Sequence, residues 1–508
     1  MHFRAFALSC FRAKNKNMRY IFLHILIFIG LSAFAQQPTT LTLDLERTVQ
    51  LANDSSLSAF RAQNMYLRSY WQHRTFLAGR LPSVTLQMTP LRLDRGFVQR
   101  YDSELDMDVF RRQQSLFSLG RVIAEQNFDL TGGRFFMESE LSYLRNFGVH
   151  THSQFRSTPI RIGYRQDLIG FNRFRWERQI EPLQFQRAKR ELVVRMEEIA
   201  ANAIGYFFDL AMAQAEYDLA RESQANTERM YQVGQERHRI AAIDQTDLLT
   251  LRLDMVNARN NLQRVEMQRN RANAALVSFL NLDPNTRIDI ALPDHPPAFL
   301  ISVEEALMHA RANNPQYLES MQQLLESERD LDRTRREARF NMGINASVGF
   351  NQVSETFINA FRNPIQQDFA TISLSIPLVD WGVRRGQYNI ARSNLTIAQL
   401  TIQQNENRLE EDIIMTVGDF MVQQQQIQST IEAVELARLT YEQTQEQFVI
   451  GTADINRLML SADRRQRAQQ NYISSLRSYW QSYFRIRRLT LFDFKENRPI
   501  EVDFNRVR

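Results

Sequence analysis

Residues 340–350 read Phe-Asn-Met-Gly-Ile-Asn-Ala-Ser-Val-Gly-Phe, with an apolar residue or alanine at each even position and a polar residue or glycine at each odd one. Residues 370–378, Ala-Thr-Ile-Ser-Leu-Ser-Ile-Pro-Leu, repeat this alternation. A period of two predicts β-strands with one apolar face. The pattern becomes helical soon after Pro377 and contains no further proline as far as Phe448. A pair of strands therefore leads into a helix of roughly 60 residues, about 90–100 Å long.

The first 35 residues have the pattern of a secretory signal peptide. Basic residues precede the apolar run Ile21–Leu31, which is followed by the small residues Ala33 and Ala35. The alternative is a membrane anchor, but the run is shorter than the ~18–20 apolar residues that a spanning helix needs. We expect residues 1–35 to be removed on export, whether translation starts at the first methionine or at Met18.

Charge and cysteine content limit the possible partners and the source of stability. The formal charge of +5 falls to 0 after cleavage, because residues 1–35 contain five Lys or Arg and no Asp or Glu. The high pI therefore gives no argument for nucleic acid as a partner. The only cysteine, Cys10, lies in the same segment. The mature chain must be stabilised by packing or assembly rather than by disulfides.

The second half of the chain repeats the first. A constant shift of 210 residues aligns Tyr231 with Tyr441 and Asp244 with Asp454. We infer a tandem duplication. The secondary structure of residues 91–158 is not assigned from the sequence. The predicted domains are the signal peptide 1–35; a first repeat 36–298, with strands at about 83–90 and 159–169 separated by a long insert and a helical hairpin at about 174–281; a second repeat 299–490, with strands at about 340–351 and 369–378 and a helical hairpin at about 382–490; and a tail 491–508.

No motif for catalysis, phosphate binding or zinc binding occurs: the sequence lacks G-x-S-x-G, G-x-x-x-x-G-K and H-E-x-x-H. We therefore expect no enzyme, no catalytic residue, no metal site and no cofactor. The strand pairs point to architecture instead. Roughly eight strands are the usual minimum for a barrel, and two pairs fall short of that number. A cyclic homo-oligomer would supply more strands and close a barrel with a lipid-facing side and a polar lumen.

The chain resembles the TolC-like outer-membrane efflux protein family over essentially its whole mature length. The resemblance is carried by the duplicated plan of helices and strands and by a small set of segments. These are the paired starts at Leu43 and Ile301, Asn313-Asn-Pro315, the strand exit Ser375–Gly382, the turn Phe448–Ile455 and the aromatic close Tyr479–Phe494.

The resemblance implies a fold of mixed α and β class: long α-helical coiled-coil hairpins forming a periplasmic tube, plus a transmembrane β-barrel completed by a homotrimer, each copy giving four strands. It implies the outer membrane of a Gram-negative bacterium, with a large periplasmic part. The implied partners are outer-membrane lipid, a periplasmic adaptor (membrane fusion) protein and an inner-membrane pump. The implied function is a passive exit duct of a tripartite efflux or secretion system.

The resemblance also assigns sites by position. The tips of the helical hairpins, where the adaptor docks and cargo enters, are Ile240, Ala241, Ala242, Asp244, Ile450, Gly451, Thr452 and Asp454. The junctions between barrel and helices are Leu168, Asn172, Pro377, Trp381, Gly382 and Gly386. We expect residues 351–368 to face the cell exterior and the periplasm to begin near Trp381.

Two alternatives stay open. A link between Asp247 and Arg457 could hold the entrance closed, as charged rings do in other channels. Equally, the two could be exposed charges contributing less than ~1 kcal/mol. For the whole chain, the alternative to a channel is a secreted coiled-coil scaffold or adhesin. The alternating strands argue against that class, because a scaffold needs no lipid-facing surface.

Overall fold

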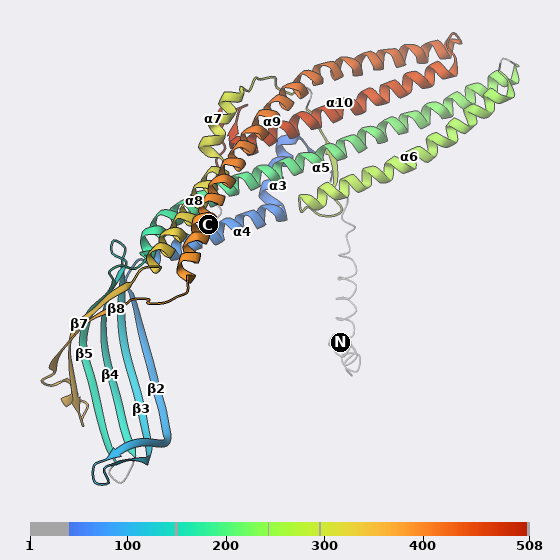
Figure 1. Ribbon diagram of the computed structural model, residues 1–508. Coiled ribbons are helices and arrows are strands. Elements are labelled where there is room, and N and C mark those ends of the chain that lie inside the picture. Colours follow the sequence, from blue (N-terminus) through green and yellow to red (C-terminus); the bar gives the residue numbers. More distant parts are fainter. Residues whose placement is uncertain (1–39, 148–150, 242, 294–295, 505–508) are drawn as a thin grey trace, which may run out of the picture. The chain divides into compact units, whose positions relative to one another are not determined.

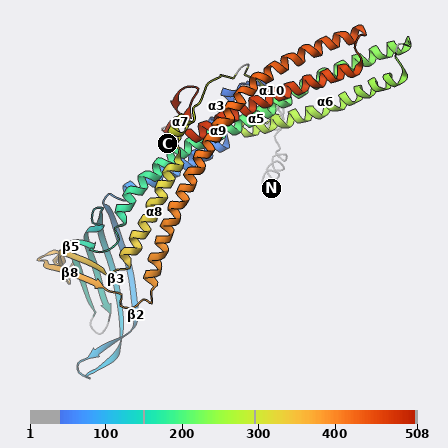
Figure 2. The same cartoon turned by 45° about the horizontal axis from the view of Figure 1, so that its top comes forward.

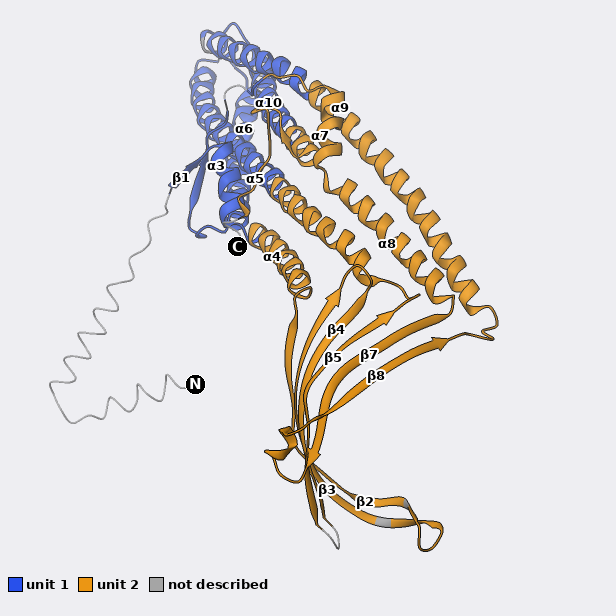
Figure 3. Ribbon diagram, turned by 90° about the vertical axis from the view of Figure 1, so that its left-hand side faces the viewer, with its two compact units in different colours: residues 1–57, 199–297, 423–481 blue, residues 58–198, 298–422, 482–508 orange. Residues whose placement is uncertain are grey.

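The computed structural model describes residues 40–147, 151–241, 243–293 and 296–504. The predicted signal peptide and Ala242 lie outside the described residues. The chain divides into two compact units (Figure 3). Unit 1 comprises residues 1–57, 199–297 and 423–481, and unit 2 comprises residues 58–198, 298–422 and 482–508.

The helices follow one plan twice, whereas four long strands lie between the helices of the first half and two between those of the second (Figure 1). The first half contains β1 (Thr40–Leu43), α3 (Leu45–Ser55), α4 (Leu57–Ala78), β2 (Ser83–Asp102), β3 (Met107–Phe128), β4 (Gly133–Phe147), β5 (His152–Asp167), α5 (Arg173–Arg239) and α6 (Gln245–Phe279). The second half contains β6 (Arg287–Ile290), α7 (Val303–Asn313), α8 (Pro315–Glu337), β7 (Asn341–Ser354), the 3-10 helix η1 (Asn359–Phe361), β8 (Ile365–Ser375), α9 (Val383–Ile450), α10 (Ile455–Thr490), β9 (Phe492–Asp493) and β10 (Arg498–Pro499). The predicted mixed α and β class, with long helical hairpins, is confirmed.

Helix lengths and caps agree between the two halves. The four helices of the first half have 11, 22, 67 and 35 residues, and those of the second have 11, 23, 68 and 36. The first helix of each half begins at a side-chain cap: Asp44 Oδ1 accepts from the Arg47 amide at 2.7 Å, and Ser302 Oγ from the Glu305 amide at 3.0 Å. These correspondences support the predicted repeat boundaries, which stay a prediction.

One antiparallel sheet of unit 2 contains six strands in the order β2-β3-β4-β5-β7-β8. The prediction of two strands in the first half is therefore wrong. The strand expected at about 83–90 extends to Asp102, and the unassigned insert completes it and adds β3, β4 and the first part of β5. The resemblance implied four strands for each copy, and this chain has six in one sheet.

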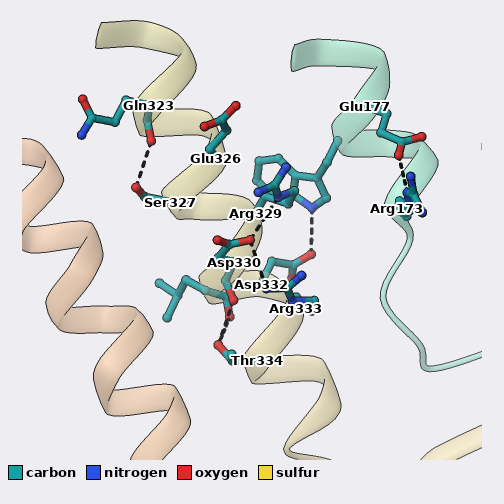
Figure 4. A network of polar contacts seen from close by, with 12 residues as sticks. Arg173, Glu177, Gln323, Glu326, Ser327, Arg329, Asp330, Asp332, Arg333 and Thr334 are labelled. Carbon is teal, nitrogen blue, oxygen red and sulfur yellow. Dashed lines mark hydrogen bonds and ion pairs between the residues drawn. The ribbon is translucent and has the colours of Figure 1, made fainter. Parts of the chain in front are cut away.

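Helices of unit 2 adjoin one end of this sheet: α4, α8 and the first parts of α5 and α9 (Figures 1 and 2). A polar network joins α5 to α8 here (Figure 4). Trp176 Nε1 donates to Asp332 Oδ2 at 3.1 Å, while Arg329 and Arg333 pair with Asp330 at 3.1 and 3.3 Å. The Trp176 hydrogen bond thus links the start of α5 to α8, whereas the two arginine pairs lie within α8.

Unit 2 also contains a buried ionic cluster. Arg487, near the end of α10, pairs with Glu197 Oε1 at 2.9 Å and with Asp493 Oδ2 at 3.1 Å. Tyr483 donates its hydroxyl to Asp493 at 2.5 Å. Burial raises the pKa of Glu197, and the adjacent Arg487 offsets only part of that effect. Burial alone would raise the pKa of Asp493 too, but the Tyr483 hydrogen bond and the Arg487 charge outweigh it and lower that pKa.

Unit 1 holds the ends of the helical hairpins and a small parallel sheet. The strand β1 pairs with β6, and Gln214 of α5 holds β6 by donating to the Ile288 carbonyl at 2.6 Å and accepting from the Ile290 amide at 3.1 Å. Among the described residues, no helix combines the length and apolar character that a membrane-spanning helix requires.

Candidate channel wall and entrance

The six-stranded sheet has one apolar face. Residues opposite each other in neighbouring strands share a face. The register places Val84, Ala124, Met137, Ile162 and Val348 in one row across five strands, and Asp368 of β8 ends this row. Four of the five are at least 47% exposed within this chain. Apolar side chains on such a surface require lipid or another protein as their neighbour.

The opposite face carries ion pairs. In the adjacent row, Glu138 of β4 lies opposite Arg161 of β5 and pairs with it. Arg121 of β3 lies opposite Glu140, and its Nε donates to Oε2 at 2.6 Å. Cross-strand pairs of opposite charge stabilise a sheet by about 0.2–1 kcal/mol each. With one apolar face and one charged face, the sheet has the two-sidedness of a membrane channel wall. We did not predict these pairs from the sequence, although Glu138 and Glu140 recur with the period of a strand.

Asn172, a predicted junction residue, caps α5 and ties it to the turn between β3 and β4. Its Oδ1 accepts from the Arg175 amide at 3.1 Å, and its Nδ2 donates to the carbonyls of Asp129 and Leu130 at 3.0 and 3.2 Å. Leu168, the other residue predicted in this copy, lies just after β5. Its amide donates to the Met342 carbonyl at 2.8 Å, which extends the β5–β7 ladder.

The second junction depends on a residue that we did not predict. Asp380 caps α9: Oδ1 accepts from the Gly382 amide at 3.0 Å and Oδ2 from the Arg384 amide at 3.2 Å. These two hydrogen bonds lower the pKa of the Asp380 carboxyl. Trp381 and Gly382 have left-handed backbones, with φ of +52° and +90°. An aspartate shortly before a predicted helix start was the signal available in the sequence.

The other predicted residues of this junction differ in their roles. Pro377 lies two residues beyond the end of β8, where a missing amide costs no ladder bond. Trp381 is 95% exposed. Gly386 lies inside α9, and its amide donates to the Gly382 carbonyl at 2.9 Å. Gly386 therefore lies within the helix, and the left-handed backbone of this junction is at residues 381–382.

The tips of the two hairpins have matching helix caps. Asp244 Oδ1 accepts from the Asp247 amide at 2.8 Å, and Asp454 Oδ1 accepts from the Arg457 amide at 2.7 Å. Asp247 and Arg457 thus occupy equivalent, exposed positions in the first turns of α6 and α10. Within the described residues of this chain, no ion pair joins the side chains of Asp247 and Arg457.

The turns themselves expose apolar residues. Ile240 is 72% and Ile450 76% exposed. Ala241 and Gly451 both have left-handed backbones, with φ of +57° and +92°. The two turns share this feature although Ala241 lacks the conformational freedom of glycine. Thr452 Oγ1 donates to the Gln447 carbonyl at 3.2 Å, so this predicted tip residue closes the end of α9.

Behind the turns, both hairpins of unit 1 share one core. Its buried members are Met230, Leu251, Tyr441, Phe448, Ala453 and Leu458, drawn from α5, α6, α9, α10 and the second turn. Tyr231 and Ile243 pack against this cluster. The two tips are therefore packed together within one chain, which the sequence analysis did not predict.

Two polar contacts reinforce the packing of the tips. Arg465 of α10 makes a two-pronged ion pair with Glu222 of α5, at 2.8 and 3.1 Å, and its guanidinium lies 4.1 Å from the Tyr441 ring centroid. Asn226 Nδ2 donates to the Tyr441 hydroxyl at 2.9 Å. These contacts link α5 to both helices of the second hairpin. The ion pair and the hydrogen bond join residues more than 200 positions apart, a relation that no local sequence pattern carries.

Comparison with known proteins agrees with this architecture. Residues 306–490 match the family model "Outer membrane efflux protein". No curated protein sequence matches the chain significantly. A membrane protein from Pseudomonas aeruginosa is similar in structure, with a TM-score of 0.64, 14% identity, and coverage of 90% of this chain and 92% of that one.

Two outer-membrane proteins are similar to the same degree. The CmeC outer membrane channel of Campylobacter jejuni has a TM-score of 0.63 and 12% identity, covering 91% of this chain and 88% of that one. The outer membrane protein VceC of Vibrio cholerae has a TM-score of 0.61 and 12% identity, with coverage of 90% and 97%. At these identities the likeness shows the fold. Together with the family match, it confirms the predicted resemblance to TolC-like efflux proteins.

Proposed function

We infer that this chain, which matches the outer membrane efflux proteins over residues 306–490 and has the fold of outer-membrane channels, is the outer-membrane component of an export system. We propose that it works as a homotrimer and as a passive duct, docked to a periplasmic adaptor and supplied by an inner-membrane pump. The observation that supports this best is the sheet of unit 2, which is apolar on one face and ion-paired on the other.

The proposal assigns a direction to the sheet. The ends of the strands that connect to α4, α5, α8 and α9 face the periplasm, and the opposite turns, including residues 355–364, face the exterior. A passive duct needs no catalytic group, and the features that bear on transport are the wall and the tips. The exposed Ile240 and Ile450 offer apolar contacts to an adaptor at the tips.

Single-channel recording of the purified, reconstituted protein tests the proposal. We expect a trimer by light scattering and stable conductance steps in a planar bilayer. A soluble, non-conducting protein that needs no detergent would contradict the channel and favour the secreted scaffold or adhesin. Conductance from a dimer or tetramer would keep the channel and overturn the homotrimer.

The tip contacts of unit 1 predict a variant with a more open entrance. The change Arg465→Glu replaces the partner of Glu222 with a like charge and removes the cation above Tyr441. The Arg465 side chain is only 20% exposed. We therefore expect the free-energy difference that favours the closed entrance over the open one to fall by about 2 kcal/mol. That loss corresponds to a roughly 30-fold shift toward the open state. The measurement is open probability in the bilayer, together with leakage of large antibiotics into cells.

The matched control for the entrance is Arg467→Glu in the same helix. Arg467 is 73% exposed and pairs with Asp463 of its own helix. This change makes the same alteration of charge without touching the contacts between hairpins. Equal gains in conductance from both variants would contradict a role for the Glu222–Arg465 contact.

The Asp247–Arg457 gate stays a separate proposal. Since no ion pair joins the two side chains in the described part of one chain, a gate would require them to meet across neighbouring copies. In that case the double change Asp247→Ala and Arg457→Ala raises conductance, and reversing both charges together restores closure. Conductance and antibiotic leakage equal to those of the wild type would refute the gate.

A further inference from the structure

The six-stranded sheet leaves two strand edges open. Each inner strand is hydrogen-bonded on both sides, so that β3, for example, pairs with β2 and with β4. Among the described strands of this sheet, only β2 and β8 have one neighbour each. In lipid, every backbone amide and carbonyl must be paired, so a sheet that spans a membrane cannot keep open edges. Both edges need a partner strand.

The hairpin β2–β3 belongs to the same wall as the other four strands. Eighteen residue pairs join β2 to β3, and fifteen join β3 to β4. The apolar row begins on this hairpin, at Val84 and Ala124, and continues through Met137 into β5 and β7. Leu86 and Met88 extend the apolar face along β2 and are more than 60% exposed. The hairpin therefore presents the same lipid-facing surface as the other strands.

Strand direction allows closure through the two open edges. Every pairing in the sheet is antiparallel, so directions alternate from β2 to β8. With six strands, β2 and β8 run in opposite directions. When β8 of one copy meets β2 of the next, their pairing is antiparallel as well. The edge of β4 that a four-stranded copy would use for closure is already occupied by β3.

We propose that each copy contributes all six strands to the barrel and that β2 of one copy pairs with β8 of the next, so that a trimer closes an eighteen-stranded wall. The trimer rests on the proposed function, whereas the seam between β2 and β8 follows from this sheet. Barrel diameter grows roughly in proportion to the number of strands. Eighteen strands would make the barrel about one and a half times as wide as the twelve that four strands per copy would give.

Cysteine cross-linking locates the seam directly, because the only cysteine, Cys10, lies in the predicted signal peptide. Thr85→Cys on β2 is combined in turn with Ser375→Cys, Ser373→Cys or Thr371→Cys on β8. All four positions lie on the ion-paired face: Thr85 shares a row with Ile123 and Glu138, and the three β8 residues lie opposite Asn341, Gly343 and Asn345. Outer membranes are mildly oxidised and run on non-reducing gels. We expect at least one combination to give a ladder of covalent oligomers ending at the trimer.

The matched control moves the first cysteine to the neighbouring hairpin. Arg134→Cys on β4 is combined with the same three β8 changes. These combinations cross-link only if the hairpin β2–β3 is displaced from the wall and β4 forms its edge. Cross-linking through β4 instead of β2 would overturn the six-stranded contribution. So would the absence of any β2–β8 cross-link in a protein that still purifies as a trimer.

A measurement on the unmodified protein guards against variants that fail to fold. Cryo-electron microscopy of the purified oligomer in nanodiscs counts the strands in the wall: eighteen supports the inference and twelve refutes it. A β2–β8 ladder that ends at another oligomer size would overturn the trimer of the proposed function while keeping the seam. The two failures can therefore be told apart.

Discussion

Replacing Arg487 with methionine is expected to lower the free energy of unfolding by about 3–5 kcal/mol. Glu197 is 4% exposed, and its Oε2 has no hydrogen-bond partner among the described residues. Removing the guanidinium would leave the buried Glu197 and the partly buried Asp493 without this shared counter-charge. Thermal unfolding of the detergent-purified protein, followed by circular dichroism, should show a Tm lower by about 5 °C or more.

The control is Arg485→Met, two residues earlier in the same helix. Arg485 also pairs with an aspartate, Asp412, but both side chains are more than one third exposed. Surface pairs of this kind contribute about 0–1 kcal/mol, so little change is expected. A second control replaces both partners, Glu197→Leu with Arg487→Met, which removes the buried charges together and should recover most of the loss. Equal losses from Arg485→Met and Arg487→Met would contradict the importance of the buried cluster.

The Arg487→Met protein should recover stability when the pH is lowered from 7 to 5. Burial raises the pKa of Glu197, and Arg487 is the group that opposes this increase. Without Arg487, the folded protein holds a proton that the unfolded chain, with a glutamate pKa near ~4.3, releases at neutral pH. The contribution to stability is therefore present at low pH and lost as the pH rises through the folded-state pKa. A Tm deficit that is equally large at both pH values would argue against this assignment.

The helical part of the fold was predictable because its signals are long and periodic. In α9, the positions Phe420, Ile427, Val434, Tyr441 and Phe448 follow a spacing of seven; Val434 is half-buried and the other four are buried. A period sustained over many turns survives a local irregularity. The duplicated tips were predictable for the same reason: the spacing of 210 places Asp244 and Asp454 at equivalent helix caps, which the hydrogen bonds bear out.

The strands of the first half were harder to predict because bulges reset the alternation. Between Thr89 and Arg92 the register with β3 shifts, and Pro90 lies inside this irregularity. Even positions carry the apolar face before the bulge, and odd positions carry it afterwards, starting with Leu91. An alternation followed through residues 83–102 without allowing for this shift therefore shows no apolar face. In β3, Phe117 lies opposite Arg92, whose guanidinium is 4.7 Å from the ring centroid, so an aromatic residue occupies the polar face.

The tip contacts and the buried cluster were not predictable from local patterns. Glu222 meets Arg465 across 243 positions, and Glu197 meets Arg487 across 290. Each of these residues is, in sequence, an ordinary charge on a long amphipathic helix. What distinguishes them is the neighbouring helix, which only the packed structure provides. The sequence could predict where the hairpins turn, but not which side chains tie them together.

A charge placed on the apolar face of the sheet is expected to block assembly in the membrane, whereas the same charge on the other face is tolerated. Leu86→Arg and Thr85→Arg alter neighbouring residues of β2 that point to opposite faces, and Leu86 is 62% exposed in the single chain. An arginine facing lipid costs about 2–4 kcal/mol at the bilayer midplane and less near its surface, so we expect about 2 kcal/mol at Leu86. Because the change is present in every copy, a trimer would carry it three times.

Reduced outer-membrane levels and less trimer for Leu86→Arg, with near-normal levels for Thr85→Arg, would show that the row through Val84 and Ile162 faces lipid. The reverse ranking would mean that the ion-paired face of Glu138 and Arg161 contacts lipid. A stable wall cannot have that orientation, because exposing charged groups to hydrocarbon is too costly.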